Sequence, residues 1–131
     1  MPRLINIRVP VACFLAIACL QLTGCRDKCR NKVEAQQFST GKTWNAVTFS
    51  RNCDASSGNN LQISILPADA KLPGAPGNAF SADDNQGITN FIAQPQWISD
   101  HVLQITYSSR AHIFRKEIHV GPVEIHYVEQ R

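Results

Sequence analysis

The sequence has no hydrophobic run long enough to span a bilayer and no large excess of charge of either sign. Its longest apolar run, residues 9–20, is shorter than the roughly 18 residues that a membrane-spanning helix needs. Charged residues make up only 18% of the 131 residues, and hydrophobic residues make up 44%. This composition excludes a disordered tail and suits one globular domain.

The sequence also lacks catalytic residues at the spacing of a known catalytic motif. The sequence contains no Gly-x-Ser-x-Gly motif, and the neighbours at residues 99–101, Ser-Asp-His, cannot aim at one another as a triad must. Residues 41–43, Gly-Lys-Thr, resemble the end of a phosphate-binding loop, but the first glycine of that motif would fall on Gln36. We interpret both segments as turns and expect no enzyme activity.

The start of the chain is typical of an export signal. Arg3 and Arg8 precede the run at residues 9–20, whose length suits the hydrophobic region of a signal peptide. The quartet that follows is Leu22-Thr23-Gly24-Cys25. It resembles the lipobox of bacterial lipoproteins, in which an aliphatic residue, two small residues and a cysteine end the signal. We therefore expect a bacterial lipoprotein precursor with a signal peptide at residues 1–24; the alternative is a short buried helix followed by an ordinary cysteine.

The lipobox resemblance implies that Cys25 is modified with lipid. Its thiol would receive a diacylglyceryl group, the signal would be removed, and the new amino terminus would be acylated, so several acyl chains would anchor the protein to the membrane. Residues 25–31 would form the lipidated cysteine and its tether. In the enteric sorting rule of this family, Asp after the cysteine favours the inner membrane. Because Arg26 stands there, we prefer the outer membrane, facing the periplasm.

Removal of the signal would also change the charge balance. Loss of Arg3 and Arg8 leaves 11 basic against 10 acidic side chains. A mature domain so close to neutral gives no electrostatic reason to bind nucleic acid. We therefore expect partners other than nucleic acid.

Export further determines the state of the remaining cysteines. The signal would carry away Cys13 and Cys19, and lipid would occupy Cys25, so Cys29 and Cys53 would be the two thiols left in an oxidising compartment. We predict a disulfide between them. The alternative is a two-cysteine metal or redox site, for which the sequence offers no Cys-x-x-Cys.

Alternating hydrophobicity and turn residues predict an all-β periplasmic domain over residues 32–131. The expected strands cover residues 32–38, 43–51, 61–66, 88–93, 95–98, 102–107, 111–120 and 123–129. Residues 67–87 are rich in Pro and Gly and predict a long irregular connection, either functional or mobile. The economical architecture is a single antiparallel sheet or sandwich of about seven strands.

Four segments resemble a group of small exported bacterial proteins with no assigned activity. They are residues 39–42, 51–58 and 64–67 and the run Trp97-x-Ser99-Asp100-x-x-Leu103-x-Ile105-x-Tyr107. Thr40, Asp54, Ser56 and Ser57 depart from the pattern of that group. The resemblance implies one domain and a structural role for Cys53, and it implies no function.

The last two expected strands offer a candidate metal site. In a hairpin centred on residues 121–122, His119 would face Glu124 and Glu117 would face His126, all on one side. Two imidazoles and two carboxylates suit zinc or a similar divalent ion. The simpler interpretation is a solvated outer face with weak cross-strand pairs, and a one-residue slip would separate the four side chains.

Two functions remain open on the sequence. The first is a lipid-anchored, non-enzymatic module that binds another envelope protein as an accessory component or inhibitor, because loops projecting from a sheet commonly carry binding residues. Phe80, Asp83 and Asp84 in the long connection are a candidate contact surface. The second is a periplasmic metal-binding or small-ligand-binding protein that uses the face with His119 and His126.

Overall fold

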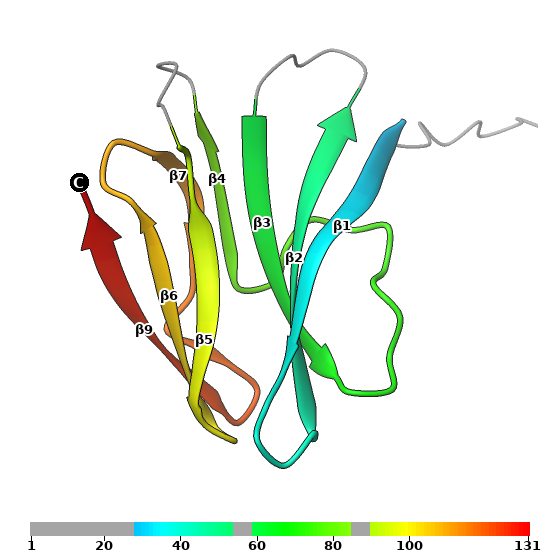
Figure 1. The fold of residues 1–131 in the computed structure, drawn as a ribbon. Helices are drawn as coiled ribbons and strands as arrows, with labels where there is room; N and C mark the ends of the chain where they lie inside the picture. Colours follow the sequence, from blue (N-terminus) through cyan, green and yellow to red (C-terminus); the bar gives the residue numbers. More distant parts are fainter. Residues whose placement is uncertain (1–27, 54–58, 85–89) are drawn as a thin grey trace, which may run out of the picture.

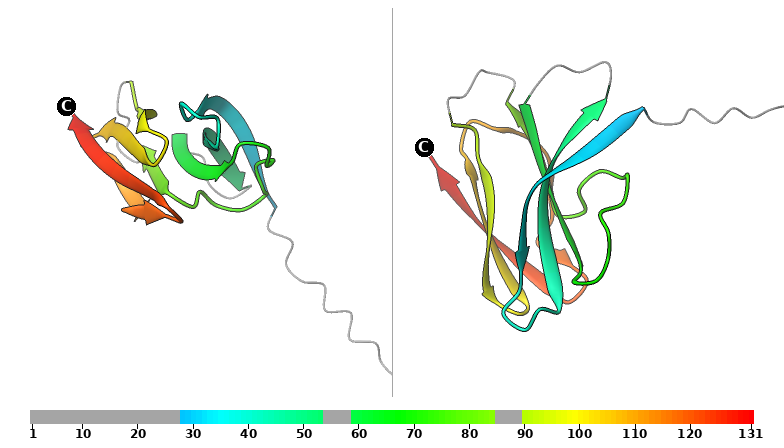
Figure 2. Two further views of the ribbon diagram at one scale, coloured as in Figure 1. Left: turned by 90° about the horizontal axis from the view of Figure 1, so that it is seen from below. Right: turned by 45° about the vertical axis from the view of Figure 1, so that its right-hand side comes forward.

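Two β-sheets pack face to face in this computed structural model, which describes residues 28–53, 59–84 and 90–131 (Figures 1 and 2). The all-β prediction is confirmed, and the described residues form nine strands rather than about seven. None of them forms a helix, so no described segment has the long apolar helix that could cross a membrane. The expected signal peptide and Cys25 lie outside the described residues.

The first sheet has five strands in the spatial order β1-β2-β3-β4-β7, and all neighbouring pairs are antiparallel. Its strands are β1 (Cys29–Phe38), β2 (Trp44–Cys53), β3 (Asn59–Pro67), β4 (Phe80–Asp84) and β7 (His112–Lys116). Strand β1 begins at Cys29, so residues 29–31, which the sequence assigned to the tether, belong to the sheet. The predicted disulfide is present and joins Cys29 to Cys53, which are directly paired in the β1–β2 register.

The second sheet has four strands in the order β5-β6-β9-β8. They are β5 (Ala93–Ser99), β6 (Val102–Ser108), β8 (His119–Val120) and β9 (Val123–Gln130). Strands β6 and β9 are parallel, which departs from the antiparallel expectation. Parallel neighbours need a crossover connection, and here the chain supplies it by passing through β7 in the first sheet before returning at β8.

Three expectations about individual strands are wrong. Residues 80–84 form strand β4, although the sequence placed them in a long irregular connection. The expected strand at residues 111–120 divides into β7 and β8, which lie in different sheets. Residues 90–92 are not strand, and the rest of the expected strand at 88–93 either falls outside the described residues or begins β5.

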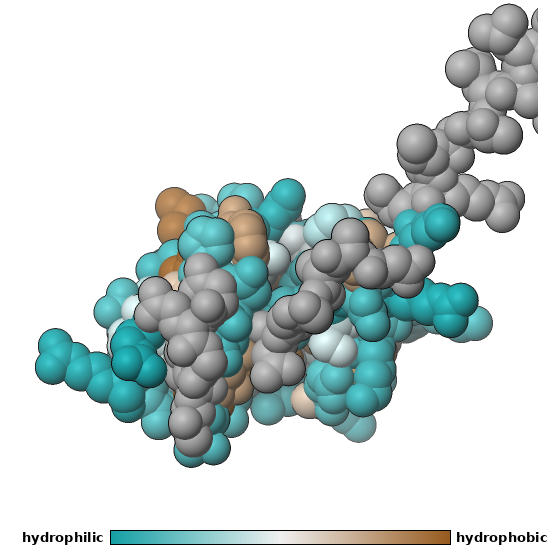
Figure 3. All heavy atoms as spheres, turned by 90° about the horizontal axis from the view of Figure 1, so that it is seen from above, coloured by the Kyte–Doolittle hydropathy of each residue, from teal (hydrophilic) through white to brown (hydrophobic). Residues whose placement is uncertain are grey.

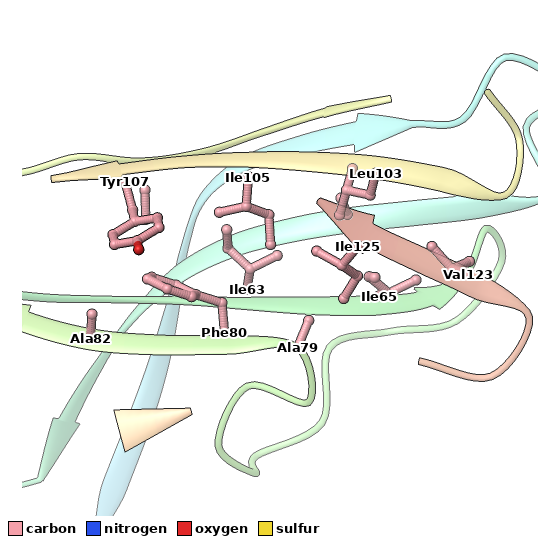
Figure 4. Close-up of a cluster of buried hydrophobic side chains, with 12 residues drawn as sticks. Ile63, Ile65, Ala79, Phe80, Ala82, Leu103, Ile105, Tyr107, Val123 and Ile125 are labelled. Carbon is pink, nitrogen blue, oxygen red and sulfur yellow. The ribbon is translucent and has the colours of Figure 1, made fainter. Parts of the chain in front are cut away.

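The core lies between the sheets and is built from alternate residues of the central strands (Figure 4). Leu103, Ile105 and Tyr107 on β6 face Ile63 and Phe80 of the first sheet. Tyr107 and Phe80 are almost completely buried, with their ring centroids 5.4 Å apart. Burial of aliphatic and aromatic side chains from both layers is the main stabilising contribution in such a sandwich.

Candidate functional site

The predicted histidine face lies at the β8–β9 hairpin, and the structure confirms part of its geometry. His119 is paired with Glu124, as the sequence predicted. His126, two residues further along β9, has its Nε2 atom 2.7 Å from Oε1 of Glu124. This hydrogen bond lowers the pKa of the Glu124 carboxyl, and His119 contributes more weakly in the same direction.

Glu117 does not join the other three side chains. At this position the chain has just left β7 and is still bonded to the first sheet: the Glu117 backbone N donates to the carbonyl oxygen of Ala79 at 2.9 Å, and the Glu117 carbonyl accepts a hydrogen bond from the Tyr127 hydroxyl. Burial raises the pKa of Tyr127. The part of the chain that the structure describes contains no group of three or more His, Cys, Asp or Glu side chains arranged to hold a metal ion. The predicted pairing of Glu117 with His126 is therefore wrong.

His119, Glu124 and His126 belong to a larger surface, which we call the bare face. It is the side of the second sheet that points away from the core, and no described segment lies over it (Figure 2). Gln96, Gln104 and His126 form one row across β5, β6 and β9 because they are paired in register. The pairing registers place Gln94, Gln96, Val102, Gln104, Thr106, His119, Glu124, His126 and Val128 on this face.

The bare face carries little charge. It contains no Lys or Arg, and its one carboxylate, Glu124, already accepts a hydrogen bond from His126. Its remaining polar groups are the amides of three Gln side chains, the hydroxyl of Thr106 and the imidazole of His119, all of which can donate and accept hydrogen bonds. A surface of this kind can form many directional contacts without the cost of desolvating several charges.

The outer side of the first sheet, which we call the covered face, is built differently. The connection at residues 68–79 lies against it, on the side away from the second sheet (Figure 2). Leu72 from this connection packs on Val47, Phe49 and Leu66, which form a second hydrophobic cluster. Phe49 is 0% exposed although it points away from the main core.

Hydrogen bonds from the strands hold this connection in place. The Nδ2 atom of Asn31 donates to the carbonyl oxygens of Pro73 and Ala75 at 2.9 and 2.8 Å. The buried guanidinium of Arg51 donates to the carbonyl oxygen of Gly74 at 3.0 Å and to Oδ1 of Asn31 at 2.8 Å. The described part of the long connection is therefore packed structure.

The last residues of the connection are fixed to strand β3. Asn78 accepts a hydrogen bond from the backbone N of Ile65 at 2.8 Å and donates to its carbonyl oxygen at 2.9 Å, so one side-chain amide replaces a strand pairing. The backbone N of Gly77 donates to Oε1 of Gln62 at 2.8 Å. A Cβ atom at Gly77 would lie 2.8 Å from the carbonyl oxygen of Phe80, so only glycine allows this close approach.

The two segments that could be mistaken for catalytic motifs form a contact between the sheets. Residues 39–43 turn β1 into β2, and residues 99–101 turn β5 into β6, as predicted. Oδ1 of Asp100 accepts a hydrogen bond from the backbone N of Gly41 at 2.5 Å, and Nε1 of Trp97 donates to the carbonyl oxygen of Gln37 at 2.8 Å. The Gly41 hydrogen bond, followed by one from Ser39, lowers the pKa of the Asp100 carboxyl.

The expected contact surface in the long connection is also corrected. Phe80 is 0% exposed and belongs to the core, so it cannot meet a partner. Asp83 is half-buried on β4, with Oδ1 3.4 Å from Nδ1 of His112 on β7. Asp84 ends the same strand and is half-buried. Phe80 therefore anchors β4 in the core, and Asp83 contacts the neighbouring strand β7.

A cavity of about 620 Å³ opens at the end of the second sheet where β6 and β9 finish. Its described lining consists of Asn90, Ile92, Ser108, Ser109, Arg110, Gln130 and Arg131. No local sequence pattern indicates this cavity, because its two arginines come from a turn and from the end of the described chain. Both arginines are exposed.

In comparisons with known proteins, no protein-family model, curated protein or solved structure matches the chain.

Proposed function

We propose that this chain is a lipid-anchored protein of the bacterial cell envelope, held by lipid on Cys25, and that it binds another envelope protein without catalysing a reaction. The bare face of the second sheet receives the partner. The protein acts as an accessory component or an inhibitor, preferably at the outer membrane and facing the periplasm.

The disulfide supports the envelope location. Cys29 and Cys53 are paired at the end of the sheet where the described chain begins, and disulfides persist mainly in oxidising compartments such as the periplasm. Closing a loop of this length stabilises the fold by about 3 to 4 kcal/mol in the chain-entropy model. The lipobox resemblance at residues 22–25 adds the membrane anchor.

The bare face is the observation that carries the binding proposal. The cores of protein interfaces are depleted of charged residues, and this face has one carboxylate and no Lys or Arg. An anionic polymer would find no Lys or Arg on this face. The occupant that matches this chemistry is a folded protein with a flat, polar and largely uncharged surface, which pairs with the amides of Gln94, Gln96 and Gln104.

The edge of β5 also favours contact through the face. Pro95 lies within this edge strand and has no N–H to offer to an added strand. A partner strand that extended the sheet at β5 would lose that hydrogen bond. Side chains on the bare face are therefore the better contact.

The anchor is tested in the producing cell by Cys25→Ala. The variant should remain unprocessed, because only a thiol can receive the lipid, and mass spectrometry of the wild-type protein should find acyl chains on residue 25. Normal processing of the variant would remove the lipoprotein part of the proposal.

The binding face is tested by photocrosslinking of the full-length protein in its own host. A photoreactive amino acid is placed at Gln96 or His126 on the bare face and, as a matched control, at the exposed Lys71 on the covered side. Both bare-face positions should capture the same envelope protein, and Lys71 should not. Equal capture from all three positions would contradict the assignment of the face.

A further inference from the structure

We propose that the cavity at the end of the second sheet binds a phosphate group, which Arg110 and Arg131 recognise together. The source is either the headgroup of an anionic phospholipid or inorganic phosphate, and the chemistry of recognition is the same for both. The lipid source rests on the proposed anchor at Cys25, whereas the phosphate chemistry rests on the cavity alone.

The lining of the cavity suits an oxyanion. Guanidinium groups bind phosphate oxygens through paired, charge-assisted hydrogen bonds. Neither Arg110 nor Arg131 forms an ion pair with any described residue. The side chains of Asn90, Ser109 and Gln130 add uncharged hydrogen-bonding groups around the same space.

Two carboxylates at this end of the molecule, those of Glu129 and Asp83, contact groups outside the cavity. Glu129, next to the lining residue Gln130, accepts a hydrogen bond from the Tyr107 hydroxyl at 2.8 Å, and that hydroxyl in turn accepts one from Lys116 at 2.9 Å. Asp83 at the same end of the molecule lies beside His112. No Asp or Glu is among the described residues that line the cavity, so their side chains give it a positive charge.

The position of the cavity links it to the membrane. Strand β1 begins at the end of the sandwich where β9 finishes, so Cys29 and the cavity lie at one end of the molecule (Figure 1). Three residues lie between Cys25 and Cys29, so the two cysteines are four residue steps apart, a length of chain that spans at most about 14 Å. A lipid on Cys25 would therefore hold this end close to the headgroups. Figure 3 views this end and shows that its described atoms are mainly hydrophilic.

The test is chemical protection of arginines in the purified full-length protein. Phenylglyoxal modification of Arg110 and Arg131 is followed by mass spectrometry as inorganic phosphate is added, and separately as short-chain phosphatidylglycerol or phosphatidylcholine is added. Arg115, which lies 3.9 Å from Glu117 and outside the cavity, is the internal control. Modification of both cavity arginines should slow severalfold with phosphate or phosphatidylglycerol, while Arg115 should be unaffected.

Variants give the second readout. Arg110→Gln should weaken phosphate binding by about fivefold, the effect of one arginine near an anionic surface, and Arg115→Gln should leave it unchanged. Protection by phosphatidylglycerol alone would identify the lipid as the source, and protection by inorganic phosphate alone would identify a soluble phosphate. No protection, or equal protection of Arg115, would overturn the proposal. Because the phosphate titration does not require lipid on Cys25, failure of the anchor would leave its result interpretable.

Discussion

The outer faces of the two sheets are built on the same alternating pattern, but a connection covers one of them and no described segment covers the other. On the first sheet, residues 68–79 lie over the strands, and Phe49 is buried beneath Leu72. On the second sheet, no described segment lies over Gln96, Gln104 and His126. The first face is fixed by hydrogen bonds within the chain, whereas the amides of the second remain available to a partner.

Polar residues on the covered face stabilise the fold, whereas polar residues on the bare face have side chains that a binding partner could contact. Asn31 and Arg51 on the covered face donate hydrogen bonds to backbone carbonyls of the connection, and Asn78 within the connection pairs with the backbone of Ile65 on β3. Polar residues on the bare face do not stabilise any described connection. Substitutions on the two faces should therefore have different consequences.

Truncation of Phe49 should destabilise the fold more than any other substitution considered for the two faces. Phe49→Ala should lower the free energy of unfolding by about 3 to 5 kcal/mol, because it leaves a cavity between β2 and Leu72. Val128→Ala on the bare face should change it by less than about 0.5 kcal/mol, since that side chain is already 42% exposed. Denaturant unfolding measures both. Similar losses in the two variants would show that the covered face is not a second core.

The next effect concerns the hydrogen bonds of the connection. Asn78→Ala should destabilise the fold by about 2 to 3 kcal/mol, because both the N–H and the carbonyl of Ile65 lose their partner. Gln96→Ala on the bare face is the control and should be nearly neutral. A neutral Asn78→Ala, measured in the same unfolding assay, would mean that water replaces the amide without loss.

The contact between the two hairpins should depend on pH. The pKa of Asp100 is lowered in the folded protein, so its contribution is present above the ordinary value of 3.8 and is lost as the pH falls through the lowered pKa. Asp100→Asn should be less stable than the wild type at pH 7, and the difference should shrink between pH 5 and pH 2. Thermal unfolding across this range checks it, and a constant difference would contradict the electrostatic cause.

Glu124→Gln provides the comparison on the bare face. The pKa of Glu124 is also lowered, mainly by the hydrogen bond from His126, so its contribution is lost on acidification in the same direction. The effect should be smaller than that of Asp100→Asn, because Glu124 and His126 lie on one strand and join no separate elements. A larger loss in Glu124→Gln would show that the bare face also stabilises the fold.

Much of the fold could be predicted from local patterns. Strands β2, β3, β6 and β9 alternate clearly, and the disulfide followed from counting the thiols expected to remain after export. Strand β4 was missed because its inward residues are only Phe80 and Ala82, and the strand follows a segment rich in Pro and Gly and ends in two aspartates. The change of sheet after Lys116 was missed because the apolar pattern continues without a turn signal.

The candidate site was less predictable, since it depends on contacts between distant residues. The pairing of His119 with Glu124 followed from a short hairpin. The row from Gln96 to His126 requires the parallel pairing of β6 with β9, which no local pattern indicates. The burial of Phe49 depends on Leu72, and nothing in the sequence around either residue reveals that they meet.

We propose that the bare face binds a partner and contributes little to the stability of the fold. Gln104→Lys probes both properties at once, because Gln104 lies between Gln96 and His126 in the same row. We predict that the free energy of unfolding of the variant lies within about 0.5 kcal/mol of the wild-type value. Crosslinking from Gln96 to the envelope partner in the host should be lost. Unchanged crosslinking to the same partner would contradict the account.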